Sequence, residues 1–263
     1  MYFTKMHGLG NDYLYYFGEL ENPQELSKKL SDRHFGIGSD GIITISPSKI
    51  ADFQMRIFNA DGSEARMCGN GIRCVGKYVY EKGYTDKEVL KIETLSGIRT
   101  LQLKTVGTKV KSVAVDMGQA VVEGPVSLMV GDQEITCTPV SMGNPHAVVF
   151  TQDVENAPLN TIGAMLEKHE FIPDGVNVEF VEQIEPKLLR MRVWERDSGV
   201  TMACGTGACA SVAAAVQAGI CPLEEDITVQ LDGGKLHIKI HMDMTVMMTG
   251  TADTICECEV KNI

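Results

Sequence analysis

The sequence lacks any apolar run of the roughly 18 to 20 residues that a membrane-spanning helix needs. Its start, MYFTKMHGLGNDY, also lacks the apolar core of a secretory signal peptide. Positive charge is scarce, since 24 Lys and Arg stand against 35 Asp and Glu, for a formal net charge of −11. Phosphate contacts would have to form against a repulsive field. We therefore expect a cytoplasmic protein with neither a membrane nor a nucleic acid as partner.

Zinc-type spacing is also missing, although the chain has eight cysteines. Zinc sites usually show C-x2-C pairs or nearby histidines, and neither pattern occurs here. The closest pairs have other spacings: Cys68/Cys74, Cys204/Cys209 and Cys256/Cys258. Cytoplasmic cysteines are thiols by default. We expect no bound metal and no structural disulfide framework.

What the sequence does contain is one internal repeat, at a shift of 136 positions. RIFNADGSEARMCGNG (56–71) then lies on RVWERDSGVTMACGTG (192–207), and Cys68 falls on Cys204. A solenoid needs at least three short units, so two similar domains are the better interpretation. A chain of 263 residues can bury two modest cores. We predict domains at 1–115 and 116–250, with the tail 251–263 returning to the first.

Strand patterns dominate the two halves. Alternating apolar residues predict strands at four places: 88–94, 101–106, 111–117 and 235–242. His237 and His241 would lie on the solvated side of the last strand. Helices are expected at 22–30, 70–83, 160–169 and 206–219. The last has small residues on nearly every side, as suits a helix wrapped by strands. This predicts an α+β fold of two pseudo-symmetric domains, each a curved, mostly antiparallel sheet wrapped around a central helix.

Two matched cysteines carry the chemistry. Cys68 and Cys204 each precede a Gly-x-Gly turn where an expected helix begins. Free N–H groups and the positive end of the helix dipole point there. We expect this to lower a thiol pKa by roughly one unit from about 8.5 and to favour thiolate. The alternative is a small buried residue beside a bend.

One such thiol would suggest a nucleophile, but two in matched halves suggest a different role. If they approach one ligand from opposite sides, one thiolate can remove a proton from a carbon while the other thiol returns a proton to the opposite face. That sequence of steps inverts a stereocentre. Two helix N-termini would meet the charge that develops on the substrate carboxylate, so no pyridoxal phosphate would be required.

Six segments spread over nearly the whole chain closely resemble the diaminopimelate epimerase family: HGLGNDY (7–13), FNADGSEARMCGNGIRC (58–74), SMGNPHAVV (141–149), GVNVEF (175–180), WER (194–196) and ACGTGACA (203–210). The resemblance implies a cofactor-free, two-base isomerase. Its reaction would interconvert LL- and meso-diaminopimelate, precursors of lysine and peptidoglycan. A homodimer is also implied.

The resemblance further implies residue roles. Cys68 would be the acid and Cys204 the base in the LL-to-meso direction, while Glu195 and His146 position the reacting amino group and poise the thiols. The implied substrate-binding residues are Asn11, Asn59, Gly69, Asn70, Asn144, Asn177, Glu195, Arg196, Gly205 and Thr206. Three residues depart from the usual family pattern and leave substrate tuning open: Gly41, Asp197 and Val200.

Other functions remain compatible with these motifs. One is another cofactor-independent amino-acid racemase on the same scaffold, acting for instance on histidine or lanthionine. Asn59, Asn177 and Arg196 favour a substrate with a second charged head group. An isomerase of the phenazine-biosynthesis type would not explain paired cysteines. A non-catalytic amino-acid-binding protein would bind without proton exchange.

Overall fold

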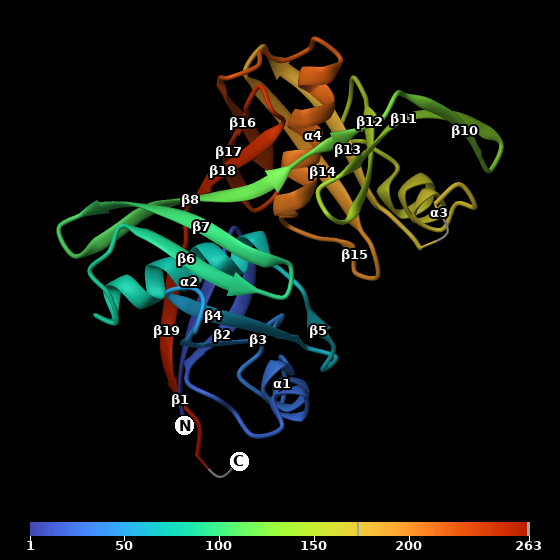
Figure 1. Cartoon of the computed structure of the whole chain (residues 1–263). Coiled ribbons are helices and arrows are strands. Elements are labelled where there is room, and N and C mark those ends of the chain that lie inside the picture. Colours follow the sequence, from blue (N-terminus) through green and yellow to red (C-terminus); the bar gives the residue numbers. More distant parts are fainter. Residues whose placement is uncertain (173, 262–263) are drawn as a thin grey trace. The chain divides into compact units, whose positions relative to one another are not determined.

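The computed structural model describes residues 1–172 and 174–261. The chain divides into two units: unit 1 is Met1–Val115 with Gly250–Ile263, and unit 2 is Asp116–Thr249. In each unit, strands surround one long helix, α2 in unit 1 and α4 in unit 2 (Figure 1). Over the described ranges, no helix is both long enough and apolar enough to cross a membrane.

Unit 1 is a mostly antiparallel sheet. Its strands are β1 (Tyr2–Gly8), β2 (Asn11–Phe17), β3 (Gly41–Pro47), β4 (Phe53–Asn59), β5 (Glu64–Ala65), β6 (Val89–Thr94), β7 (Gly97–Val106), β8 (Lys109–Gln119, continuing into unit 2) and β19 (Asp253–Glu259). From β1 to β2, β3, β4, β6, β7 and β8, successive pairings are antiparallel, parallel, antiparallel, parallel, antiparallel and antiparallel. The tail strand β19 adds to β1 antiparallel.

Unit 2 repeats this order. Its strands are β9 (Val121–Val122), β10 (Val126–Val130), β11 (Gln133–Ser141), β12 (Pro145–Phe150), β13 (Asn177–Glu185), β14 (Leu188–Glu195), β15 (Gly199–Val200), β16 (Asp226–Leu231), β17 (Gly234–Ile240) and β18 (Thr245–Gly250). From β11 to β12, β13, β14, β16, β17 and β18, the pairings alternate in the same way as in unit 1. The predicted pseudo-symmetric α+β fold is confirmed.

The register makes the equivalence of single residues explicit. β3 and β13, β4 and β14, and α2 (Gly69–Glu81) and α4 (Gly205–Gln217) follow the 136-residue shift. In the preceding strand the shift is 133, because Leu14 pairs with Ile42 whereas Ala147 pairs with Val178. Asn11 is therefore the counterpart of Asn144.

The two central helices are both buried, but with side chains of different size. α4 is built of small residues, and Ala208, Ala210 and Ala213 are fully buried, so neighbouring strands can approach its backbone closely. In α2, larger side chains such as Ile72 and Val75 fill the same role. Both helices end at glycines with positive φ, Gly83 (76°) and Gly219 (72°), the conformation that glycine adopts without steric cost.

Two local predictions need correction, whereas α1 (Pro23–Ser31) begins after Asn22 as expected. The helix expected at 160–169 is a π-helical turn, η1 (Leu159–Gly163), followed by the short α3 (Ala164–Glu167). β17 ends at Ile240, so His241 lies in a turn, where its Nδ1 is 3.0 Å from Glu224 Oε2. The bond from His241 N to Thr245 O closes the turn between β17 and β18.

Candidate active site

Each central helix begins with a cysteine as its N-cap. Cys68 and Cys204 have extended backbones, with φ of −138° and −113°. Cys68 Sγ accepts a hydrogen bond from Gly71 N at 3.3 Å, and Cys204 Sγ accepts one from Gly207 N at 3.4 Å. The sulfurs thus stand where a capping oxygen usually stands. The predicted position at the helix mouth is confirmed for both thiols.

In unit 1, an amide side chain links the thiol to the helix. Cys68 Sγ lies 3.3 Å from Asn11 Oδ1, and Asn70 Nδ2 approaches the same oxygen at 3.5 Å. Asn11 Nδ2 donates to Asp40 Oδ2 at 2.7 Å, which fixes the orientation of the Asn11 amide. The structure therefore brings together three of the predicted residues, Asn11, Cys68 and Asn70.

A charged network supports Asn11 from behind. Asp12 binds Arg33 at 2.7 Å and Lys5 at 3.0 Å, and Arg33 also binds Asp40 at 2.8 Å. Burial by itself raises the pKa of the Asp12 carboxyl, but hydrogen bonds and charge from Arg33 and Lys5 outweigh it, and the net pKa lies below its ordinary value. Sequence reasoning missed this network, although GNDY and GSD carry its acids.

Arg73 is a second supporting residue that the sequence did not reveal. It is fully buried in α2. Its Nη1 donates to Gly69 O and its Nη2 to Asn70 Oδ1, both at 3.0 Å, and its Nε donates to Thr251 O at 3.1 Å. The guanidinium therefore fixes the first turn of α2 and ties it to the tail of the chain.

The side chain of Asn59, another predicted residue of unit 1, donates within its own turn and not to this cluster. Its Nδ2 donates to Ser63 Oγ at 3.0 Å. The backbone geometry at position 41 accounts for Gly41, one of the departures from the family pattern. Its φ is 155°, and a Cβ built there would lie 2.2 Å from Phe58 O, so this backbone has no room for a side chain at position 41.

In unit 2, the thiol is surrounded by hydroxyl and carboxylate groups. Asn144 Nδ2 donates to Thr206 Oγ1 at 3.3 Å, and that hydroxyl lies 3.6 Å from Cys204 Sγ. Thr201 Oγ1 donates to Glu195 Oε2 at 2.6 Å, and Glu195 shares a hydrogen bond with the Cys204 thiol. Burial raises the pKa of Glu195, although both of these bonds act against the rise.

The lowered pKa that the sequence predicted for the Cys204 thiol is wrong. Burial raises the pKa of its thiol well above the ordinary value, and the charges of Glu195 and Glu179 raise it further. Hydrogen bonds from Thr206 and Gly207 N lower it, but by less. The helix mouth acts as predicted, but desolvation and two nearby carboxylates outweigh it, so Cys204 rests as a thiol.

His146 forms a buried pair with Glu179, and of these two residues the sequence predicted only His146 as part of the site. Its Nδ1 is 2.7 Å from Glu179 Oε1, and both side chains are fully buried. Glu179 belongs to the GVNVEF segment but was not selected as a site residue. The relevant signal was an acid inside a run of apolar strand residues, since such acids are rarely buried without a partner.

Arg196 and Asn177 form a separate group. Asn177 Nδ2 donates to Pro145 O, and its Oδ1 accepts from Arg196 N, both at 3.0 Å. Arg196 Nη1 donates to Asp174 O at 3.2 Å, and its Nε lies 3.8 Å from Asp197 Oδ2. The Arg196 guanidinium is about a third exposed, with the exposed fraction of its side chain at 37%. It therefore remains accessible to an anion.

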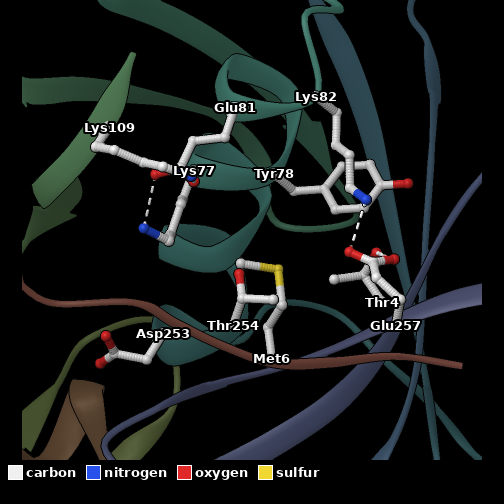
Figure 2. A pocket seen from close by; sticks show the side chains of 10 residues that line it. All are labelled: Thr4, Met6, Lys77, Tyr78, Glu81, Lys82, Lys109, Asp253, Thr254 and Glu257. Atoms are coloured by element: carbon white, nitrogen blue, oxygen red, sulfur yellow. Dashed lines mark hydrogen bonds and ion pairs between the residues drawn. The ribbon is translucent and has the colours of Figure 1, made fainter. Parts of the chain in front are cut away.

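A cavity of about 440 Å³ lies elsewhere in unit 1, among residues of β1, the second half of α2, Lys109 and the tail (Figure 2). Most of its charged groups pair with one another: Lys77 and Lys109 bind Glu81, and Lys82 binds Glu257. None of the predicted site residues lines it. Among the described residues, no group of three or more His, Cys, Asp or Glu could hold a metal.

Comparison with known proteins agrees with this architecture. The fold is similar to that of a hydroxyproline epimerase from Agrobacterium vitis, with a TM-score of 0.75 and 17% identity over 98% of this chain and 91% of that one. It is also similar to a PhzF-family phenazine biosynthesis protein from Bacillus anthracis, with a TM-score of 0.78 and 16% identity over 100% and 99% of the two chains. The fold thus defines a class, the two-domain proteins that share this architecture.

Sequence relatives identify the family within that class. The model of the diaminopimelate epimerase family matches residues 3–123 and 138–255. A diaminopimelate epimerase from Methanococcus maripaludis is 50% identical over 99% of both chains, and one from Acetivibrio thermocellus is 50% identical over 99% of this chain and 98% of the relative. The chain belongs to the diaminopimelate epimerase family and is an isomerase.

Proposed function

We propose that this chain interconverts LL- and meso-diaminopimelate without a cofactor, using Cys68 and Cys204 as acid and base. In the LL-to-meso direction, the sulfur of Cys204 takes the proton from the α-carbon. The Cys68 thiol then gives its own proton to the opposite face of that carbon. The Cys204 proton must leave before the first step, and Glu195, which shares a hydrogen bond with the thiol, is a suitable acceptor.

One observation carries this proposal: two helices of equal length begin with a cysteine N-cap at equivalent positions of two similar units. A single reactive thiol would need only one such helix. Backbone N–H groups of Gly69, Asn70, Gly205 and Thr206 lie in the first turns, where free donors suit the substrate carboxylate. Asn11, Asn59, Asn144, Asn177, Glu195 and His146 would bind or orient the rest of the substrate, and Arg196 would bind the distal carboxylate.

The test is incubation with LL-diaminopimelate in D2O, followed by chiral separation and mass measurement. A two-base mechanism predicts meso product with one deuterium on the inverted carbon. Inversion without deuterium from solvent would contradict it. Parallel incubations with histidine and lanthionine separate the related racemase activities. Binding of any of these amino acids without exchange of its α-proton would favour an amino-acid-binding protein.

We also propose that the protein acts in the cytoplasm as a homodimer. The acidic composition supports the location. The dimer rests on the family resemblance. Sedimentation equilibrium over a range of concentrations would measure the oligomeric state directly.

A further inference from the structure

Glu179 lies directly beside the first turn of α4. A Cβ built on Gly207 would stand 2.5 Å from Glu179 Oε1 and 3.2 Å from Cys204 Sγ. Gly207 is also the residue whose N–H donates to that sulfur. The carboxylate and the thiol therefore pack against the same backbone position, and the absence of a side chain at Gly207 makes this approach possible.

The carboxylate is not fully satisfied by its neighbours. His146 Nδ1 binds Glu179 Oε1 at 2.7 Å. Among the described residues, Glu179 Oε2 and His146 Nε2 are buried atoms without a hydrogen-bond partner. Burying an acid in this way is costly, and natural proteins rarely retain such groups without a use for them.

Unit 1 shows that the fold itself does not require the charge. At the position equivalent to Glu179 it has Ile43, which is fully buried. A Cβ built on Gly71, the counterpart of Gly207, would meet Ile43 Cδ1 at 2.6 Å. An apolar side chain therefore packs against the helix mouth equally well. The position equivalent to Glu195 is likewise uncharged, since it is Asn59.

We propose that Glu179 is a positioning residue that, together with Glu195, holds Cys204 in the thiol form between turnovers, so that Cys204 ionises at a higher pH than Cys68. The proposal deepens the proposed function and rests on it, because it assigns different resting protonation states to the two thiols that act in one two-base reaction. Glu179 acts through its charge and through His146, and it does not touch the substrate.

The charged groups around Cys204 come from three strands: Glu195 from β14, Glu179 from β13 and His146 from β12. After burial, the two carboxylates are the largest causes that raise the pKa of the thiol. His146 lowers the pKa of Glu195, and its Nδ1 is hydrogen-bonded to Glu179 Oε1.

The test is alkylation of the substrate-free, full-length protein with iodoacetamide, from about pH 6 to about pH 11, with each thiol followed by peptide mass mapping. The midpoint of the rate against pH reports ionisation and does not depend on how accessible each thiol is. In the unmodified chain, the Cys204 midpoint should lie above that of Cys68. Glu179→Gln keeps the size and an acceptor for His146 but removes the charge. It should lower the Cys204 midpoint by about one pH unit and leave that of Cys68 unchanged.

Glu182→Gln is the matched control. Glu182 lies on the same strand and is half-buried, and within the described part of the chain its carboxylate accepts only from Val154 N, at 3.0 Å. Its replacement should move neither midpoint. In turnover assays, Glu179→Gln should shift the pH profile of kcat/KM with little change in KM, which a purely structural defect would not produce.

Three results would overturn the proposal: equal midpoints for the two thiols in the unmodified chain, an unmoved Cys204 midpoint in Glu179→Gln, or an equal shift in Glu182→Gln. The comparison within the unmodified chain holds even if a variant fails to fold. Because alkylation needs no substrate, failure of this inference is distinct from failure of the proposed function, which would appear as an unmodified chain that does not epimerise diaminopimelate.

Discussion

The side chains around the two thiols differ between the units, although the backbone is alike at the two helix starts. Beside Cys68 stands the amide of Asn11, held by Asp40. Beside Cys204 stand the hydroxyl of Thr206 and the carboxylate of Glu195. A buried carboxylate opposes the ionisation of a neighbouring thiol. The two equivalent cysteines therefore have chemically unlike neighbours.

Removing either thiol should stop the reaction. Cys68→Ala and Cys204→Ala should each lower kcat by roughly a thousandfold or more, because inversion needs an acid and a base together. Cys74 and Cys209 lie further along the same helices and are fully buried, so Cys74→Ala and Cys209→Ala are matched controls that should stay active. Steady-state assays with LL-diaminopimelate would measure this. Near-normal turnover in either thiol variant would contradict the two-base mechanism.

Arg196 should matter for affinity more than for thiol chemistry. Its guanidinium is partly exposed and already bonded to Asp174 O, so Arg196→Met removes a charge without leaving a buried partner unpaired. We expect KM for diaminopimelate to rise about tenfold or more, which corresponds to about 1.4 kcal/mol. Alkylation of Cys204 should be unchanged. An unaltered KM would place Arg196 outside the substrate site.

Asp12 should make the stability of the protein depend on acid pH. Its folded-state pKa is lowered, so its contribution is fully present above its unfolded pKa of about 4 and is lost as the pH falls through the folded value. The difference in unfolding free energy between the unmodified chain and Asp12→Asn should therefore shrink as the pH falls below about 4. Urea unfolding at several pH values measures it. A difference that does not change with pH would contradict this role of Asp12.

Among the secondary-structure elements, the first turns of α2 and α4 are the most constrained. Each sulfur occupies the capping position, and each first turn has a glycine against which a strand side chain packs closely, Ile43 at Gly71 and Glu179 at Gly207. The helix mouth, the thiol and the neighbouring strand therefore form one rigid arrangement in each unit. Small changes in the first turn should move the sulfur.

Gly207→Ala tests this rigidity. Its new Cβ would stand 2.5 Å from Glu179 Oε1, too close for contact, so the carboxylate or the helix must shift. We expect a loss of about 1 to 3 kcal/mol in unfolding free energy and a lower kcat. Gly124→Ala is the control, because its Cβ would meet nothing within 4 Å. Calorimetry and kinetic assays would check both. An unchanged kcat would show that the first turn tolerates displacement.

At the scale of the whole molecule, the chain begins and ends in the same unit. β19 pairs with β1 along its length, and Met1 N donates to Val260 O at 2.8 Å. The tail also accepts, at Thr251 O, the hydrogen bond from the buried Arg73. Unit 1 therefore depends on residues from both ends of the sequence, whereas unit 2 is continuous.

Truncation after Ala252 should weaken unit 1 selectively. It removes all of β19 and leaves β1 without one of its two partners. Amide hydrogen exchange should accelerate in β1 and β2 and change little in β13 and β14, because local stability follows the cooperative unit. Mass spectrometry of peptides would resolve the two units. Equal acceleration in both would show that they unfold as one cooperative body.

The sequence by itself determined the features that depend on neighbouring residues. The starts of α2 and α4 and the glycines that end them follow from local periodicity and capping chemistry. The positions of Cys68 and Cys204 as N-caps follow for the same reason. These features need only a few consecutive residues, and the 136-residue repeat needs only a comparison of the chain with itself, so one sequence was enough to predict them.

Tertiary structure decided the features that depend on distant residues. His146 and Glu179 are 33 positions apart, and Arg73 and Thr251 are 178 apart, yet each pair is hydrogen-bonded. The helix mouth alone predicts an acidic Cys204, but the thiol is buried beside carboxylates from two other strands, and its pKa is raised. Electrostatic energy in a protein interior depends on distance and burial rather than on sequence separation, so only the folded chain could fix it.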